Sequence, residues 1–189
     1  KALLLNVSPR VFDEGIQTAI CAIGEFMGAD RCHVFITEDE GRSARLAYEY
    51  CAPLVPSRRE RLSSFPLSAI PWIQSLVGRR EPIHVSDTGL LPAGAAAEKR
   101  RFEADGIRAV LCVAIGVRGV LRGYVGVEMT RGPREWTRDE CLLLELFSDV
   151  LAGALESSRL RRALDETEMK YSDLFMQASD PILLIDGRK

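Results

Sequence analysis

The strongest strand signals in the sequence lie close together, in residues 107–117 and 123–129. The first run reads IRAVLCVAIGV and the second reads GYVGVEM, and both are rich in the β-branched residues that favour strands. Gly119 lies in the short segment between them and suits a tight turn. An antiparallel hairpin is therefore predicted at the centre of a sheet, and the remaining elements must be arranged around it.

The chain before this hairpin alternates between helical and extended patterns. Apolar residues at helical spacing, or runs of good helix formers, predict helices over 12–27, 69–78 and 93–106. β-Branched and aromatic runs predict strands over 31–37, 44–51 and 82–85. Prolines punctuate the stretch from Pro53 to Pro82, so we expect loops and short helices there. This order favours an α+β domain.

Residues from Thr137 onward follow a helical pattern with no breaker before about Asp180. The sequence TRDE is a capping box, in which Thr137 caps the helix and Glu140 bonds back to it. We expect this helix and the helix over 12–27 to cover the same face of the sheet, because both carry apolar stripes. The stripe predicted to face the sheet consists of Leu143, Phe147, Leu151 and Ala154.

A second stripe on the long helix follows heptad spacing and predicts a parallel homodimer. Its members are Leu146, Val150, Gly153, Ser157, Leu160 and Leu164, and the spacing continues through Thr167 and Tyr171. An isolated amphipathic helix is marginal in water, which favours pairing with a second copy. A solvated single helix is the alternative, because the segment ESSRLRRALDETEMK is rich in charge. Gly153 and Ser157 weaken the packing, which would allow a shift in register along a signalling helix.

Composition excludes several classes of protein. The chain has 25 Lys and Arg against 27 Asp and Glu, so its net charge of -2 gives no reason to expect binding to nucleic acid or to acidic membranes. The run ALLLNV is too short for a signal peptide or a membrane span. The 5 cysteines include no CxxC pair, which indicates reduced thiols and a cytoplasmic protein. With only 2 histidines, no metal site is predicted.

The order of elements, together with the segments GADRCHVFI, AIPWI, EPIHVSD, GIRAVLCVAI, GYVGVE and REWTRDE, resembles the GAF domain. The resemblance runs from about Ser8 to Arg159. It implies a PAS-related, mainly antiparallel sheet of five or six strands flanked by helices, with a long C-terminal signalling helix. It also implies a ligand pocket on the sheet face away from the terminal helices.

The tail YSDLFMQASDPILLIDG resembles the first helix and strand of a PAS domain. We therefore expect an N-terminal linker (1–8), a GAF domain (9–159), a helical linker (160–170) and the truncated start of a PAS domain (171–189). This order is found in bacterial sensor histidine kinases of two-component systems and in GGDEF diguanylate cyclases. The resemblance implies a fragment of such a multidomain protein. The fragment itself contains no phosphoacceptor histidine context, no GGDEF signature and no phosphate-binding loop, so no catalytic residue is predicted.

The candidate ligand-binding residues are Trp72, Glu49, His84, Ser86, Asp87 and Cys112. Trp72 either anchors a pocket in the irregular segment 65–92 or plugs the core. Glu49 alternates with Tyr48 and Tyr50, so it faces the opposite side of its strand and needs a polar partner if that side is buried. Glu128 poses the same problem. The basic residues Arg58, Arg59 and Arg61 are expected to form a solvated turn, with an anion site as the alternative.

No cofactor follows from these patterns. The Cys32-His33 pair lies in the first strand, unlike the Cys-His of bilin-binding GAF domains, and the NKXnD pattern of cyclic-nucleotide GAF domains is absent. His84 as a haem ligand is less favoured than a packed strand histidine. The main hypothesis is a non-catalytic sensory module that relays a change to downstream domains. The alternatives are a ligand-free spacer and a thiol-dependent redox enzyme using Cys51 and Cys112.

Overall fold

The computed structural model describes residues 9–77 and 81–177. One compact unit ends at Gly153 and a second begins at Ala154. The helices are α1 (Pro9–Phe26), α2 (Pro71–Val77), α3 (Ala96–Ala104) and α4 (Arg138–Gln177). The strands are β1 (Arg31–Glu38), β2 (Ser43–Cys51), β3 (Phe65–Pro66), β4 (Ile83–Val85), β5 (Ala109–Val117) and β6 (Val120–Met129).

The strands form one 6-stranded sheet in the order β3-β2-β1-β6-β5-β4, and every neighbouring pair is antiparallel. The predicted hairpin is β5–β6, at the inner part of the sheet. Strand β6 begins three residues earlier than predicted, because the turn needs only Arg118 and Gly119, whose φ angles are 49° and 83°. Strand β3 was not predicted, since it is 2 residues long and contains Pro66.

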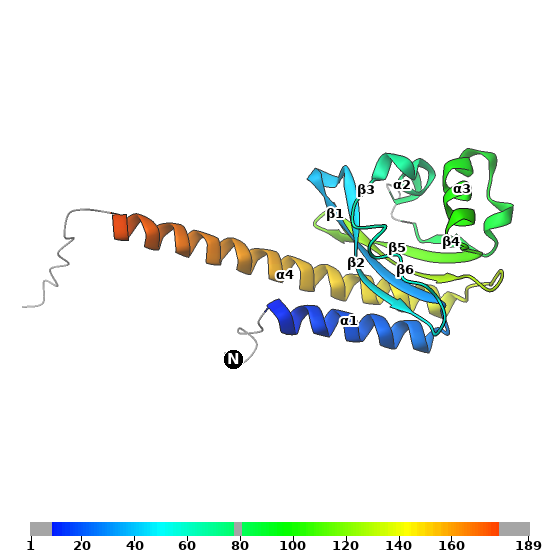
Figure 1. Cartoon of the computed structure of the whole chain (residues 1–189), viewed down its shortest axis with the longest axis horizontal. Helices are drawn as coiled ribbons and strands as arrows, with labels where there is room; N and C mark the ends of the chain where they lie inside the picture. Colours follow the sequence, from blue (N-terminus) through cyan, green and yellow to red (C-terminus); the bar gives the residue numbers. More distant parts are fainter. Residues whose placement is uncertain (1–8, 78–80, 178–189) are drawn as a thin grey trace, which may run out of the picture. The chain divides into compact units, whose positions relative to one another are not determined.

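Helices α1 and α4 cover one face of the sheet, as expected, and α2 and α3 cover the other (Figure 1). On the first face the ring of Tyr50 packs so closely on α1 that a Cβ atom at Gly24 would overlap it. The buried stripe of α4 contains Leu144, Ser148 and Leu151. Leu151 was predicted, whereas Leu144 and Ser148 are buried in place of their predicted neighbours. Leu143 and Phe147 are half-buried. Ser148 is tolerated there because its hydroxyl donates to the Ala114 carbonyl at 2.8 Å.

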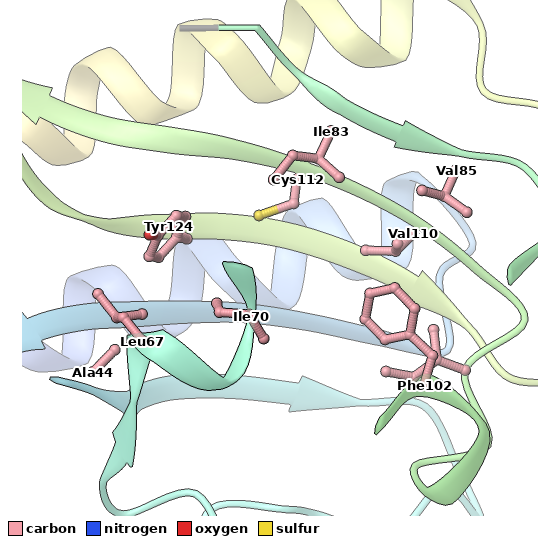
Figure 2. Close-up of a cluster of buried hydrophobic side chains, with 10 residues drawn as sticks. Ala44, Leu67, Ile70, Ile83, Val85, Phe102, Val110, Cys112 and Tyr124 are labelled. Carbon is pink, nitrogen blue, oxygen red and sulfur yellow. The ribbon is translucent and has the colours of Figure 1, made fainter. Parts of the chain in front are cut away.

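The core between the sheet and α2 and α3 positions the candidate site (Figure 2). Val110, Cys112 and Tyr124 point from β5 and β6 toward Leu67, Ile70 and Phe102 in the covering segments. Ala44, Ile83, Val85 and Ile107 complete this buried cluster. Full burial of such side chains contributes about 1.5–3 kcal/mol each, so the covering segments are held mainly by apolar contacts.

The capping box at the start of α4 is confirmed. The Glu140 amide donates to the Thr137 hydroxyl at 3.2 Å, and the Thr137 amide donates to the Glu140 carboxylate at 2.8 Å. Helix α4 continues without a break through Gln177, as the absence of a helix breaker before about Asp180 predicted. That residues 171–189 begin a PAS domain stays a prediction. The strand predicted over 182–185 lies outside the described residues. Within the described part of the chain, no helix combines the length and apolar character needed to cross a membrane.

Candidate functional site

Glu49 and Glu128 lie on the face of the sheet covered by α2 and α3, and both have polar partners there. Tyr48 and Tyr50 turn toward α1, where Tyr48 donates to Asp13 and Tyr50 packs on Gly24. Glu49 therefore faces the other side, where it accepts from the Ser57 hydroxyl at 2.6 Å and from the Arg58 amide at 3.1 Å. Glu49 and Glu128 both form ion pairs with the Arg58 guanidinium. The predicted need for a partner is met by an arginine and a backbone amide together.

Arg58 is the centre of a buried ion-pair cluster, and its side chain is only 5% exposed. Its Nη1 donates to Asp105 Oδ2 at 3.0 Å and its Nη2 lies 2.8 Å from Glu128 Oε2. Its Nε lies 3.8 Å from Glu49 Oε1. One guanidinium thus joins the loop after β2, the residue that follows α3, and strand β6.

Two further arginines complete the cluster. Arg31 Nη1 lies 3.5 Å from Glu128 Oε2, and Arg61 Nη2 lies 2.6 Å from Asp105 Oδ1. The prediction of a solvated basic turn is wrong for Arg58, because carboxylates on the sheet and on α3 attract it into the interior. The backbone supports this arrangement: the Leu62 amide donates to the Arg58 carbonyl, and the Leu46 amide of β2 donates to the Leu62 carbonyl.

Burial and charge act differently on the pKa values of Arg58 and His33. Burial alone would lower the pKa of Arg58, but Glu128, Asp105 and Glu49 raise it above its usual value. Burial lowers the pKa of His33 to about 4, and the pull of Glu128 does not compensate. His33 Nδ1 lies 3.4 Å from Glu128 Oε1, so this histidine is a neutral member of a charged cluster at neutral pH.

A small cavity of about 70 Å³ lies between the cluster and the core under α2 and α3. Its polar lining is His33, Arg58, Arg101, Asp105 and Glu128. Its apolar lining includes Phe35, Phe65, Ile70, Ile73, Phe102, Cys112 and Tyr124. This cavity lies on the sheet face away from α1 and α4, where the resemblance to GAF domains implies a pocket.

The predicted ligand-binding residues fall in two places. Trp72, His84, Ser86 and Asp87 line a separate, more open cavity of about 560 Å³. Cys112 lines the small cavity, and Glu49 belongs to the ion-pair cluster. Trp72 is half-buried and also packs against the apolar core, so it lines the open cavity and covers the core at the same time. That these residues bind a ligand stays a prediction.

Polar groups of the open cavity already have protein partners. The Ser86 hydroxyl donates to Glu135 at 2.9 Å, and the Asp87 carboxylate accepts from the Gly89 amide at 2.8 Å. Arg134 pairs with Glu140 and lies over the Trp136 ring, 4.7 Å from its centroid. The small cavity is the stronger candidate, because it is the less open of the two and four of its polar lining residues, His33, Arg58, Asp105 and Glu128, are buried.

Arg58, Arg101, Asp105 and His33 line the small cavity but were not identified from the sequence as site residues. Arg58 and Arg101 stand in polar, helix- or loop-forming segments that are typical of solvated surface. Asp105 precedes Gly106 at the end of α3, where a helix-terminating role is sufficient to explain it. Among the charged residues of the cluster, only Glu128 and Glu49 could be recognised from the sequence, as charged residues within apolar strands.

Cys51 and Cys112, the two cysteines of the redox-enzyme hypothesis, lie in environments that disfavour a reactive thiol. All 5 cysteines of the chain are free, and Cys32 and Cys112 are buried. Burial raises the pKa of both buried thiols to about 12, and it also raises the pKa of Cys51. A thiol must ionise to act as a nucleophile, so this environment disfavours the redox-enzyme hypothesis. Among the described residues, no group of three or more His, Cys, Asp or Glu side chains is arranged to hold a metal ion.

Replacing Arg58 with Ala should destabilise the domain by about 3–5 kcal/mol, because three buried carboxylates lose their shared partner. Urea unfolding followed by circular dichroism measures the change. Arg59→Ala is the matched control, since Arg59 is the exposed neighbour and should cost less than about 1 kcal/mol. Similar losses for the two variants would contradict the central role of Arg58.

Stability should fall as the pH is lowered from about 6.5 to about 4, the window set by His33. Above this window His33 is neutral in both states, whereas within it the unfolded chain binds a proton that the folded chain does not. The loss from this residue is on the order of 3 kcal/mol. His33→Gln should flatten the dependence in urea unfolding across this range. His84→Gln, at an exposed strand position, should leave it unchanged; an equal slope in all three proteins would refute the assignment.

Comparison with known proteins gives a consistent result. The family model of the GAF domain matches residues 12–155. No curated protein matches the sequence. The chain is similar to GAF3 of Slr1393 from Synechocystis sp. PCC6803 in its photoproduct state, with 22% identity, 80% of this chain and 98% of that chain covered, and a TM-score of 0.67.

Two other solved structures are similar to it. The phycoerythrobilin-bound GAF domain of a cyanobacterial phytochrome has 18% identity, with 80% of this chain and 88% of that chain covered and a TM-score of 0.67. The PixJ GAF domain of Thermosynechococcus elongatus in its blue-light absorbing form has 19% identity, with 91% and 99% covered and a TM-score of 0.61. At these identities the structures support the fold, and the family match spans most of the sequence: the chain belongs to the GAF domain family.

Proposed function

We propose that this GAF domain is a non-catalytic sensory module of a cytoplasmic bacterial signalling protein. A small molecule binds in the cavity between the sheet and helices α2 and α3, and the resulting change passes to α4. The observation that carries the proposal is the Arg58 cluster, because it connects the wall of that cavity to the strand that precedes α4.

The first step of the relay is the contact of Arg58 with both Asp105 and Glu128. Asp105 follows the last residue of α3, which covers the cavity, and Glu128 lies in β6. All three side chains line the cavity. An occupant that displaces α3 or competes for Arg58 therefore changes the charge environment of β6 directly.

The second step leads from β6 to the first turn of α4. The Arg108 amide donates to the Met129 carbonyl at the end of β6, at 2.7 Å. Arg134, in the loop that follows, donates to the Met27 carbonyl after α1 at 2.7 Å and pairs with Glu140 in α4. This loop ties the end of α1 to the start of α4, so a shift of β6 has a route to both helices.

A bilin is not proposed as the ligand, although three of the similar structures hold one. The cavity of about 70 Å³ is far below the roughly 300–1,000 Å³ of pockets that enclose larger ligands. Cys112 is the only cysteine among its described lining residues, and burial keeps its thiol protonated. Cys32 alternates with His33 along β1 and so faces the helices on the other side of the sheet.

The exposed stripe of α4 supports a parallel homodimer in the proposed relay. Leu146, Val150, Leu160, Leu164 and Tyr171 are each 57–67% exposed, and Gly153 and Ser157 are exposed between them. These apolar residues need a partner to be buried, and heptad spacing suits a second copy of the same helix. Parallel pairing would deliver two equivalent chain ends to the same side, as a downstream PAS domain and a histidine kinase or diguanylate cyclase output would require.

A ligand-free spacer is the second candidate function, and the small size of the cavity favours it. The two functions differ in whether purified protein retains a small molecule. Native mass spectrometry should detect such a molecule on the unmodified chain. Ile73→Trp should abolish retention, because the larger side chain fills the cavity from α2. Ser86→Ala, in the open cavity, should retain the molecule.

The outcomes of that experiment separate the candidates. Circular dichroism must show that Ile73→Trp remains folded. If Ile73→Trp retains the molecule while Ser86→Ala and Trp72→Ala lose it, the ligand belongs to the open cavity instead. A chain that carries no molecule under any condition would support the spacer.

Replacing both Leu160 and Leu164 with Asp should convert the dimer to a monomer without unfolding the domain. Two buried leucines per helix contribute enough that the dissociation constant should rise by at least about 100-fold. Light scattering over a concentration series measures the species. Met169→Asp is the control, because Met169 is equally exposed but lies off the heptad stripe. A double variant that stays dimeric, or an unmodified chain that is monomeric, would show that the stripe is solvated.

A further inference from the structure

Tyr124 carries a buried hydroxyl that is not satisfied by the protein around it. The side chain is 3% exposed, and within residues 9–77 and 81–177 its oxygen has no hydrogen-bond partner. Burial raises the pKa of Tyr124, so the hydroxyl stays protonated and can donate. A buried polar group without a partner costs free energy, which a bound molecule recovers if it supplies the missing acceptor.

This tyrosine is part of the wall of the small cavity under α2 and α3. It lies in β6 and points to the same side of the sheet as Cys112, toward Leu67 and Ile70 (Figure 2). The lining around it is largely apolar, with the side chains of Phe35, Phe65, Ile70, Ile73, Ile83, Phe102 and Val110. A ligand in this cavity is therefore surrounded by apolar side chains, with the Tyr124 hydroxyl as a donor that is still available.

The charged groups in the wall of this cavity balance. Two arginines and two acids line it, namely Arg58, Arg101, Asp105 and Glu128. Arg58 pairs with both acids. Arg101 packs on the Phe65 ring, with its Cζ 4.5 Å from the ring centroid. An ionic ligand would bring a charge without a counterion into this wall, so a neutral ligand is favoured.

The volume of the cavity limits a ligand to very few atoms. An apolar cavity of about 150 Å³ in a protein core takes up one benzene molecule. The cavity of about 70 Å³ is roughly half that size, so it suits a ligand of about three non-hydrogen atoms.

We propose that this cavity binds a short-chain alcohol or aldehyde of about three non-hydrogen atoms, whose single oxygen accepts a hydrogen bond from the Tyr124 hydroxyl. The bond satisfies the buried tyrosine, and the carbon atoms occupy the space among the phenylalanines and isoleucines. This inference rests on the proposed ligand-binding function and names the class of ligand.

Ethanol and propane test the proposal, because they have the same number of non-hydrogen atoms and differ in one oxygen. Amide chemical shifts in NMR follow the titration of the chain with ethanol up to about 100 mM, since so small a ligand reaches a dissociation constant of about 1 mM at best. Propane is dissolved under pressure. Tyr124→Phe should weaken ethanol binding about tenfold, because the ligand oxygen loses its donor, and should not weaken propane binding. Tyr171→Phe is the matched control, since Tyr171 is exposed on α4, and should change neither affinity.

Urea unfolding gives a second measurement on the same variant. Tyr124→Phe should unfold at the same urea concentration as the unmodified chain or at a higher one, because the substitution removes an unpaired buried group. A lower midpoint would show that the hydroxyl is already bonded within the protein, and this would overturn the inference.

The binding experiment has outcomes that overturn the inference in distinguishable ways. An equal effect of Tyr124→Phe on the two probes excludes the hydroxyl as the partner of the ligand oxygen. Ethanol binding that persists in Ile73→Trp, where the larger side chain fills the cavity, places the ligand elsewhere. Absence of ethanol binding overturns the ligand class, whereas the proposed function stands or falls on retention of a molecule in native mass spectrometry.

Discussion

Arg58 places a positive charge in the interior, where its side chain is only 5% exposed. Carboxylates from three parts of the chain surround that charge. Taking a guanidinium out of water costs several kcal/mol, and only close carboxylates and hydrogen bonds offset that cost. The three carboxylates come from β2, the position after α3, and β6. Glu49 is 9 positions from Arg58 in the sequence, whereas Asp105 and Glu128 lie 47 and 70 positions away. The position of each element is therefore coupled to the others.

The two faces of the sheet have different environments, because successive residues of each strand point to opposite faces. On one side, Cys32, Val34, Leu111 and Val127 are fully buried under α1 and α4. On the other, His33, Glu49 and Glu128 lie around Arg58, and His33 and Glu128 also line the small cavity. Because successive residues of a strand point to opposite faces, a dry helical interface and a charged cavity are built by the same strands. Strand β5, for example, carries Cys112 on the cavity side and contacts α4 on the other side, through the bond from Ser148 to the Ala114 carbonyl.

Much of the fold was predictable from local patterns. The helices, five of the six strands, the turn at Gly119 and the capping box of α4 follow from residues that are adjacent or one helical turn apart. Strand β3 was missed because two residues carry too little pattern. The buried stripe on α4 was misplaced around Leu144 and Ser148, because a serine in an apolar interface is invisible until its acceptor, the Ala114 carbonyl, is known.

The sequence by itself determined the family, the two-sided sheet and the problem posed by Glu49 and Glu128, since these depend on periodicity and on the order of elements. Only the tertiary structure decided which charges meet. Arg58, Arg59 and Arg61 look alike in sequence, yet one is buried in the cluster, because its neighbours in space come from distant segments. The same holds for Arg100 and Arg101: a helix turns by about 100° per residue, so one faces solvent and its neighbour faces the cavity.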